Sequence, residues 1–130
     1  MKITNFLVCE FANSEPLGKV NLIGVGVDRY YPDTLPVVLL FYLYLRCVPE
    51  PNDLPGNKKG RIRLIGEDGL LEDQPIRIHF TEDKPVGVLI YKFAFRVTTP
   101  GLFRFESSVE GSQETASWPI QVFPASTPPA

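Results

Sequence analysis

Apolar side chains alternate with polar ones along most of the chain, or form short runs bounded by Gly, Pro, Asn and Asp. No long segment shows the 3.6-residue period of an amphipathic helix, so the pattern predicts strands throughout, about eight of them. The expected strands are residues 2–11, 19–28, 36–47, 61–66, 75–81, 86–98, 102–109 and 114–123. Their even spacing leaves no room for crossover helices and favours an all-β, two-layer antiparallel β-sandwich over a closed barrel.

Gly, Pro, Asn and Asp also mark the connections between these strands. Turns are expected at residues 13–18 and 82–85, and the most irregular loop at 49–59, which holds three prolines. Gly24 and Gly26 inside an expected strand indicate a bulge or a close backbone approach. With 130 residues, the chain is predicted to form a single β-sandwich domain over 1–123, followed by a Pro-rich flexible C-terminal tail at 124–130.

Strand alternation assigns most large apolar side chains to one buried face, because neighbouring side chains point to opposite sides of a sheet. The resulting core is rich in aromatic residues. Its strongest candidates are Phe93, Phe95, Phe103, Phe105 and Trp118. Aromatic residues at strand spacing are typical of a core rather than of a ligand-binding cage.

The strand expected at 36–47 is apolar on both faces. Leu39, Phe41, Leu43 and Leu45 form one face, and Leu40, Tyr42 and Tyr44 form the other. Such a strand is either covered on both sides or exposes one face to a partner, and Tyr is common at protein interfaces. Leu40, Tyr42 and Tyr44 are therefore candidate interface residues, although a long loop covering them would explain the pattern equally well.

Composition and charge restrict the class of protein. The net charge of −2 and the pI of about 5.4 argue against a nucleic-acid-binding domain. The longest apolar run, residues 37–45, is too short to span a membrane, and the N-terminus lacks the features of a signal peptide, so a cytoplasmic location is expected. In that setting Cys9 and Cys47 are expected to be reduced core residues, with a disulfide between the two sheets as the alternative.

Motifs for catalysis or cofactor binding are scarce. His79 is the only histidine, and no nucleophile motif accompanies it, so neither a zinc site nor a catalytic triad is expected. Gly24-Val25-Gly26 begins like a dinucleotide-binding loop, but no helix follows. Calcium binding by the acidic pairs at 67–68, 72–73 and 82–83 is a weak alternative to ordinary turns. No catalytic residue, metal or cofactor is predicted.

The basic residues are unevenly distributed, because nine of the thirteen Lys and Arg residues fall between Lys58 and Arg104, and six of these nine are expected at outward strand positions. If these strands share a sheet, they form a basic face that binds a phosphate, an anionic polymer or an acidic protein. The candidate ligand-binding residues are Arg61, Arg63, Arg77, His79, Lys92, Arg96 and Arg104. The competing interpretation is an ordinary solvated face whose positive charge prevents edge-to-edge aggregation.

Two stretches carry a family resemblance: Phe6-Leu7-Val8-Cys9-Glu10 followed by residues 18–25, and Thr99-Pro100-Gly101-Leu102-Phe103-Arg104-Phe105 followed by residues 118–122. Together they resemble a family of small bacterial proteins with a domain of unknown function. The closing stretch is also similar to immunoglobulin-like domains, although the Cys-Trp-Cys spacing of antibody domains is absent. The resemblance implies an immunoglobulin-like β-sandwich in a bacterial cytoplasm, and it implies no catalytic residue.

These observations favour a non-enzymatic protein that binds another protein or itself, without membrane or nucleic-acid partners. A binding module for an anionic ligand on the basic face is the alternative, and a small enzyme centred on His79 is a third.

Overall fold

The computed structural model describes residues 1–16, 19–84 and 86–129, which form nine strands. Parts of the predicted turns at 13–18 and 82–85, and the last residue of the tail, lie outside these residues. The strands are β1 (Lys2–Ser14), β2 (Val20–Val25), β3 (Arg29–Tyr30), β4 (Val37–Val48), β5 (Gly56–Gly66), β6 (Gly69–Phe80), β7 (Gly87–Val97), β8 (Gly101–Val109) and β9 (Ala116–Val122).

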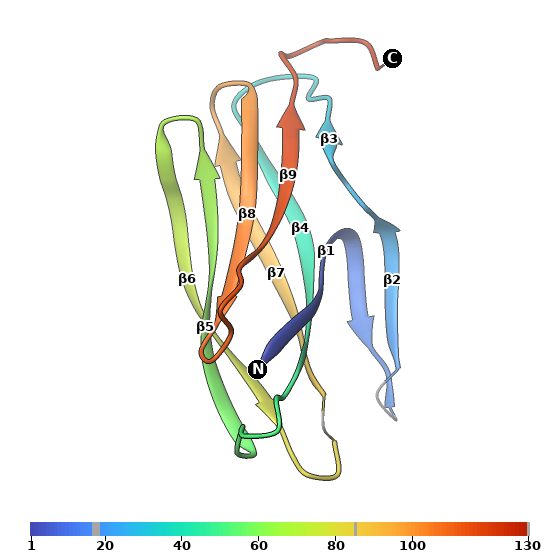
Figure 1. Ribbon diagram of the computed structural model, residues 1–130. Helices are drawn as coiled ribbons and strands as arrows, with labels where there is room; N and C mark the ends of the chain where they lie inside the picture. Colours follow the sequence, from blue (N-terminus) through green and yellow to red (C-terminus); the bar gives the residue numbers. More distant parts are fainter. Residues whose placement is uncertain (17–18, 85, 130) are drawn as a thin grey trace.

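The strands form two packed sheets, as the sequence pattern predicts (Figure 1). One sheet has four strands in the order β2-β1-β4-β7, and the other has five in the order β3-β9-β8-β5-β6. Neighbouring strands are antiparallel except for β3 and β9, which pair in parallel over two residues. The fold is an all-β sandwich, and the prediction of its class is confirmed.

The core between the sheets is built largely from side chains at alternate strand positions. Phe105 is fully buried at its centre, and its ring packs edge-on against those of Phe41, Phe93 and Phe95. Phe103 is buried beside them, and Trp118 is half-buried against this cluster. The indole nitrogen of Trp118 donates a hydrogen bond to the Val27 carbonyl oxygen at 2.8 Å, which fixes the loop before β3 to the sandwich.

Two strands begin earlier than the alternation predicts. Strand β5 starts at Gly56, inside the expected loop, because Asn57, Lys58 and Lys59 pair with β6 although their side chains are polar. Strand β6 starts at Gly69, directly after a tight turn. It pairs only with β5, so this edge strand needs no continuous apolar face, and the alternation therefore failed to reveal its first half.

Close backbone approach explains one of the glycines noted in the sequence. Gly24 has φ of +64°, and a Cβ built there would lie 2.6 Å from carbons of the Glu10 side chain. The expected close approach is confirmed at this position.

The C-terminal tail contacts the loop after β3. Ser126 donates one hydrogen bond from its backbone N–H to the carbonyl oxygen of Pro32 and one from its hydroxyl to the carbonyl oxygen of Asp33.

Candidate interaction surface

The four-stranded sheet has an outward side, here called the outer A face, that contains most of the exposed large apolar side chains of the described chain. Residues that are directly paired in an antiparallel ladder share a face, so the register identifies its members. They are Lys2, Asn5, Leu7, Cys9, Phe11 and Asn13 of β1, Asn21, Ile23 and Val25 of β2, Val38, Leu40, Tyr42, Tyr44, Arg46 and Val48 of β4, and Val88, Ile90, Lys92, Ala94 and Arg96 of β7.

The three predicted interface residues lie together near the middle of the outer A face. Leu40 is 44% exposed, and Tyr42 and Tyr44 are half-buried. The Tyr42 ring meets that of Phe11 edge to face, with ring centroids 5.2 Å apart. The exposure of Leu40 shows that no loop among the described residues buries it, so the alternative of a covering loop is wrong for Leu40.

Strands β1, β2 and β7 add apolar residues to this face that the sequence interpretation did not include. The exposed ones are Phe11, Ile23, Val25 and Val88. The signal was present for β7, because assigning its inward side chains to alternate positions leaves Val88 and Ile90 pointing outward. The order of the strands in the sheet decides which residues extend the patch, and alternation within one strand carries no information on that order.

Cys9 lies on the outer A face and is nevertheless fully buried. Its direct cross-strand neighbours are Tyr42 and Val25. Burial raises the pKa of the Cys9 thiol. The side chains of this face therefore already pack closely around a central small residue, and the patch is an ordered surface rather than a set of isolated apolar groups.

Cys47 lies on the opposite side of the same sheet, in the core. Burial raises the pKa of its thiol to about 11. Both cysteines are free in the structure, as expected, and the disulfide between sheets is wrong because the two residues belong to one sheet and face away from each other.

The predicted ligand-binding residues are divided between the two sheets. Arg61 and Arg63 of β5, Arg77 and His79 of β6 and Arg104 of β8 lie on the outward side of the five-stranded sheet, here called the outer B face. Lys92 and Arg96 of β7 instead belong to the outer A face. The condition that all seven residues share one sheet is therefore not met, because β6 and β7 are edge strands of different sheets.

Carboxylates neutralise the centre of the outer B face. Asp73 Oδ1 lies 2.7 Å from Arg61 Nε and 3.7 Å from Arg63 Nε, and Glu106 lies 3.8 Å from Arg63 and 3.5 Å from Arg104. The hydrogen bond from Arg61 lowers the pKa of the Asp73 carboxyl, and Asp73 in turn raises the pKa of Arg61. These arginines are engaged in a network on their own sheet.

One corner of the outer B face has an excess of positive charge. Lys59 and Arg77 are directly paired across β5 and β6, and like charges in this position destabilise a sheet. Together with Arg61 they line an open depression of about 830 Å³, which Glu110 also borders. An anion bound there would relieve the repulsion between the two cations.

His79 lies on β6, where its Nδ1 is 3.0 Å from Oδ1 of Asn57 on the paired strand. No carboxylate or hydroxyl is hydrogen-bonded to this ring within residues 1–16, 19–84 and 86–129. The contact orients the imidazole at the surface and supplies neither a general base partner nor a nucleophile.

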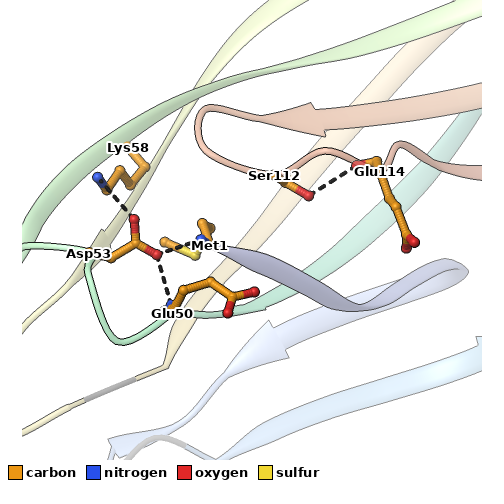
Figure 2. Close-up of polar contacts among 6 residues, drawn as sticks. All are labelled: Met1, Glu50, Asp53, Lys58, Ser112 and Glu114. Atoms are coloured by element: carbon orange, nitrogen blue, oxygen red, sulfur yellow. Dashed lines mark hydrogen bonds and ion pairs between the residues drawn. The ribbon is translucent and has the colours of Figure 1, made fainter.

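Asp53, in the loop between β4 and β5, is the centre of a separate polar cluster (Figure 2). Its carboxylate accepts hydrogen bonds from the α-ammonium group of Met1 and from the backbone N–H of Glu50, the latter at 2.8 Å, and lies 3.5 Å from Lys58 Nζ. The hydrogen bond from Met1, followed by that from Glu50, lowers the pKa of Asp53 to about 2. The cluster attaches the start of β1 to this loop.

No group of three or more His, Cys, Asp or Glu side chains is arranged to hold a metal ion in the parts of the chain that are described. In each of the three acidic pairs, one carboxylate has another polar partner. Asp73 pairs with arginines, and Asp83 accepts a hydrogen bond from the Thr81 hydroxyl at 2.5 Å. A Glu67 oxygen accepts a hydrogen bond from the backbone N–H of Leu102.

The described residues contain no helix that is long and apolar enough to cross a membrane.

Among solved structures, the chain is similar to the CARDB domain of the PF1109 protein from Pyrococcus furiosus, which was crystallised in complex with di-metal ions. The identity is 11%, the match covers 92% of this chain and 88% of that domain, and the TM-score is 0.50. This likeness concerns the fold alone, an immunoglobulin-like β-sandwich.

A second similar structure is a β-glucosidase from Listeria innocua in complex with isofagomine, at 11% identity and a TM-score of 0.45. The match covers 93% of this chain but only 16% of the glucosidase. No curated protein matches the sequence closely enough to be a relative.

The sequence itself matches one family model over residues 4–123, which span all nine strands except the first residues of β1. The expected resemblance to a domain of unknown function is thereby confirmed. The chain belongs to the DUF6941 family, a family of unknown function.

Proposed function

We propose that this protein acts by binding another protein chain through the outer A face, and that its role is binding rather than catalysis. The observation that carries the proposal is the exposure of Phe11, Ile23, Val25, Val38 and Leu40 on the same side of the neighbouring strands β1, β2 and β4. Soluble monomers rarely expose large contiguous apolar patches unless the patch meets a partner.

The composition of the face supports the same conclusion. Tyr42 and Tyr44 present polar hydroxyl groups on apolar rings, and Tyr and Phe are enriched in protein interfaces. The charged residues of the face lie on the edge strand β7 or near the end of the sheet where β1 begins, which resembles the arrangement of an apolar interface core with a polar rim. A rigid sheet that is packed on its other side loses little conformational entropy when it binds.

The test compares Leu40→Asp with Leu102→Asp. Leu40 is 44% exposed on the outer A face and Leu102 is 49% exposed on the outer B face, so the two variants introduce the same charge at similar exposure on opposite sheets. Immobilised wild-type protein and each variant are used to capture proteins from a lysate of the source cell, with quantification by mass spectrometry. Light scattering on the purified proteins measures self-association.

We expect wild-type protein and Leu102→Asp to retain the same partner or the same oligomeric state, and Leu40→Asp to lose it at least tenfold. Equal capture by the two variants would refute the proposal, and so would a wild-type protein that is monomeric and captures nothing. Circular dichroism and thermal unfolding show whether each variant is folded.

The corner of the outer B face at Lys59, Arg61 and Arg77 supports a second candidate function, binding of an anionic ligand. The carrying observation is the direct pairing of Lys59 with Arg77 beside an open depression. Titration with inorganic phosphate and with heparin, followed by NMR, should shift amide signals of β5 and β6 in wild-type protein, and Arg77→Glu should abolish the shifts. Unchanged shifts in Arg77→Glu would exclude this site.

A further inference from the structure

We propose that the chain bound by the outer A face is an acidic segment of a different protein, one that presents an apolar strip flanked by Asp and Glu, and is not a second copy of this chain. This inference rests on the proposed function and adds the chemistry of the partner to it.

The charge of the outer A face is of one sign. Its charged side chains are Lys2, Arg46, Lys92 and Arg96, and the strand register places no Asp or Glu on it. No ion pair joins any of these cations to a carboxylate in the described structure, whereas Arg61, Arg63 and Arg104 on the outer B face are all paired. Arg46 makes a hydrogen bond to the neutral Thr4 hydroxyl at 2.9 Å.

The unpaired cations surround the apolar centre in a definite arrangement. Lys92 is directly paired with Tyr42, and Arg96 with Val38, so both lie along the β7 side of the patch. Arg46 and Lys2 lie at the end of the sheet near the start of β1. Glu72 of β6 borders the same cavity as Lys92 but forms no ion pair with it. A partner that places apolar groups over Leu40 and Phe11 therefore brings its own flank against Lys92 and Arg96.

A second copy of this chain has the wrong charge for this arrangement. In a two-fold symmetric dimer the same patch contributes to both sides, so only cations would meet across the interface. Like charges that face each other across an interface without partners are unfavourable, and this repulsion selects against self-association. An acidic partner instead gains charge-assisted hydrogen bonds from the arginines and faster association.

An anionic lipid surface shares part of this chemistry. Interfacial membrane binding usually depends on an amphipathic helix or a covalent lipid that inserts apolar groups below the headgroups. The outer A face is the broad side of a sheet, and no helix projects from it among the described residues, which favours a protein partner. A vesicle arm in the experiment distinguishes the two.

The experiment selects random 16-residue displayed peptides on immobilised protein and compares three forms of it. These are wild type, Leu40→Asp and the double variant Lys92→Glu/Arg96→Glu, in which both altered side chains are exposed. Light scattering of each form reports self-association. Vesicles of phosphatidylcholine with and without phosphatidylserine serve as the lipid arm.

On wild-type protein we expect peptides that combine apolar residues with at least a threefold excess of Asp and Glu over Lys and Arg. The charge-reversed double variant should select peptides with the opposite charge preference, and Leu40→Asp should select neither. Wild-type protein should be monomeric and should not bind either kind of vesicle.

The outcomes separate the two proposals. Peptides that depend on Leu40 but show no acidic preference, Leu40-dependent self-association, or Leu40-dependent binding to phosphatidylserine vesicles would each overturn the acidic partner. The first two would leave the outer A face as a protein-binding surface. Selection that is identical on wild type and Leu40→Asp, without self-association, would overturn the proposed function itself.

Discussion

Phe11 of β1 and Tyr42 of β4 meet edge to face on the outside of the sandwich, with ring centroids 5.2 Å apart and planes inclined by 62°. Aromatic pairs of this geometry usually belong to cores, and the aromatic cluster around Phe105 is an example in the same molecule. Phe11 is nevertheless 41% exposed. The outer A face therefore has ordered aromatic packing without the cover that a core has.

The contact between Phe11 and Tyr42 should be measurable as a coupling. In a double-mutant cycle of Phe11→Ala and Tyr42→Ala, we expect the two changes in unfolding free energy to be non-additive by about 0.5–1 kcal/mol, because edge-to-face pairs contribute this much beyond buried area. Urea denaturation of the four proteins measures the coupling. Additivity within experimental error would mean that the rings do not interact in solution.

Phe105 should contribute far more to stability than Phe11. Phe105 is fully buried and packs against three neighbouring rings, so Phe105→Ala removes a large buried side chain and leaves a cavity. The expected loss of unfolding free energy is about 3–5 kcal/mol. Phe11→Ala is the matched control, and a loss of similar size in both variants would contradict the assignment of Phe105 to the centre of the core.

Ser107 of β8 is buried in the core, and its hydroxyl has no hydrogen-bond partner among the residues that the structure describes. An unsatisfied buried hydroxyl is unfavourable, so Ser107→Ala should raise the unfolding free energy by about 1 kcal/mol. Ser108→Ala, at the next and more exposed position, should change it by less than about 0.5 kcal/mol. A clear loss of stability in Ser107→Ala, measured by urea denaturation, would show that the hydroxyl is satisfied.

Asp53 should make stability depend on pH in the acid range. Its pKa in the folded protein is about 2, below the ordinary value of about 4 for an unfolded chain. The unfolded state therefore binds the proton more readily, so the stabilising contribution is fully present above about pH 5 and is lost as pH falls toward 2. Asp53→Asn removes this contribution, and the variant should be less stable than wild type at pH 7.

The difference between Asp53→Asn and wild type should shrink steadily between pH 5 and pH 3, as followed by urea denaturation at several pH values. Lys58→Ser removes only the more distant cation, 3.5 Å from Asp53, and should have a smaller effect. A difference between Asp53→Asn and wild type that stays constant over this range would contradict the charged contacts of Asp53.

The sequence pattern was sufficient for the sandwich and for its buried face, because alternation in strands such as β7 and β8 records which side chains point inward. Phe93, Phe95, Phe103 and Phe105 are all buried as predicted. The extra strand β3 and the early starts of β5 and β6 were not predictable, since short or edge strands are held by backbone hydrogen bonds and need little apolar alternation.

The candidate surface was predictable only in part. Leu40, Tyr42 and Tyr44 could be assigned to one side of a strand from the sequence, but the neighbours that extend this side are set by sheet order. The same limitation applied to the basic residues. Lys92 and Arg96 follow the same outward alternation as Arg77, yet they lie on the other sheet because the chain crosses between sheets after β6.

Site-specific photo-crosslinking at the outer A face tests the central claim most directly. A photoreactive amino acid replaces Leu40 in one protein and Leu102 in another, and the crosslinked peptides formed in the source cell are identified by mass spectrometry. We predict that position 40 crosslinks to a different protein through a segment rich in apolar residues, Asp and Glu, and that position 102 does not. Equal crosslinking at the two positions, or a product at position 40 that joins two copies of this chain, would contradict the account.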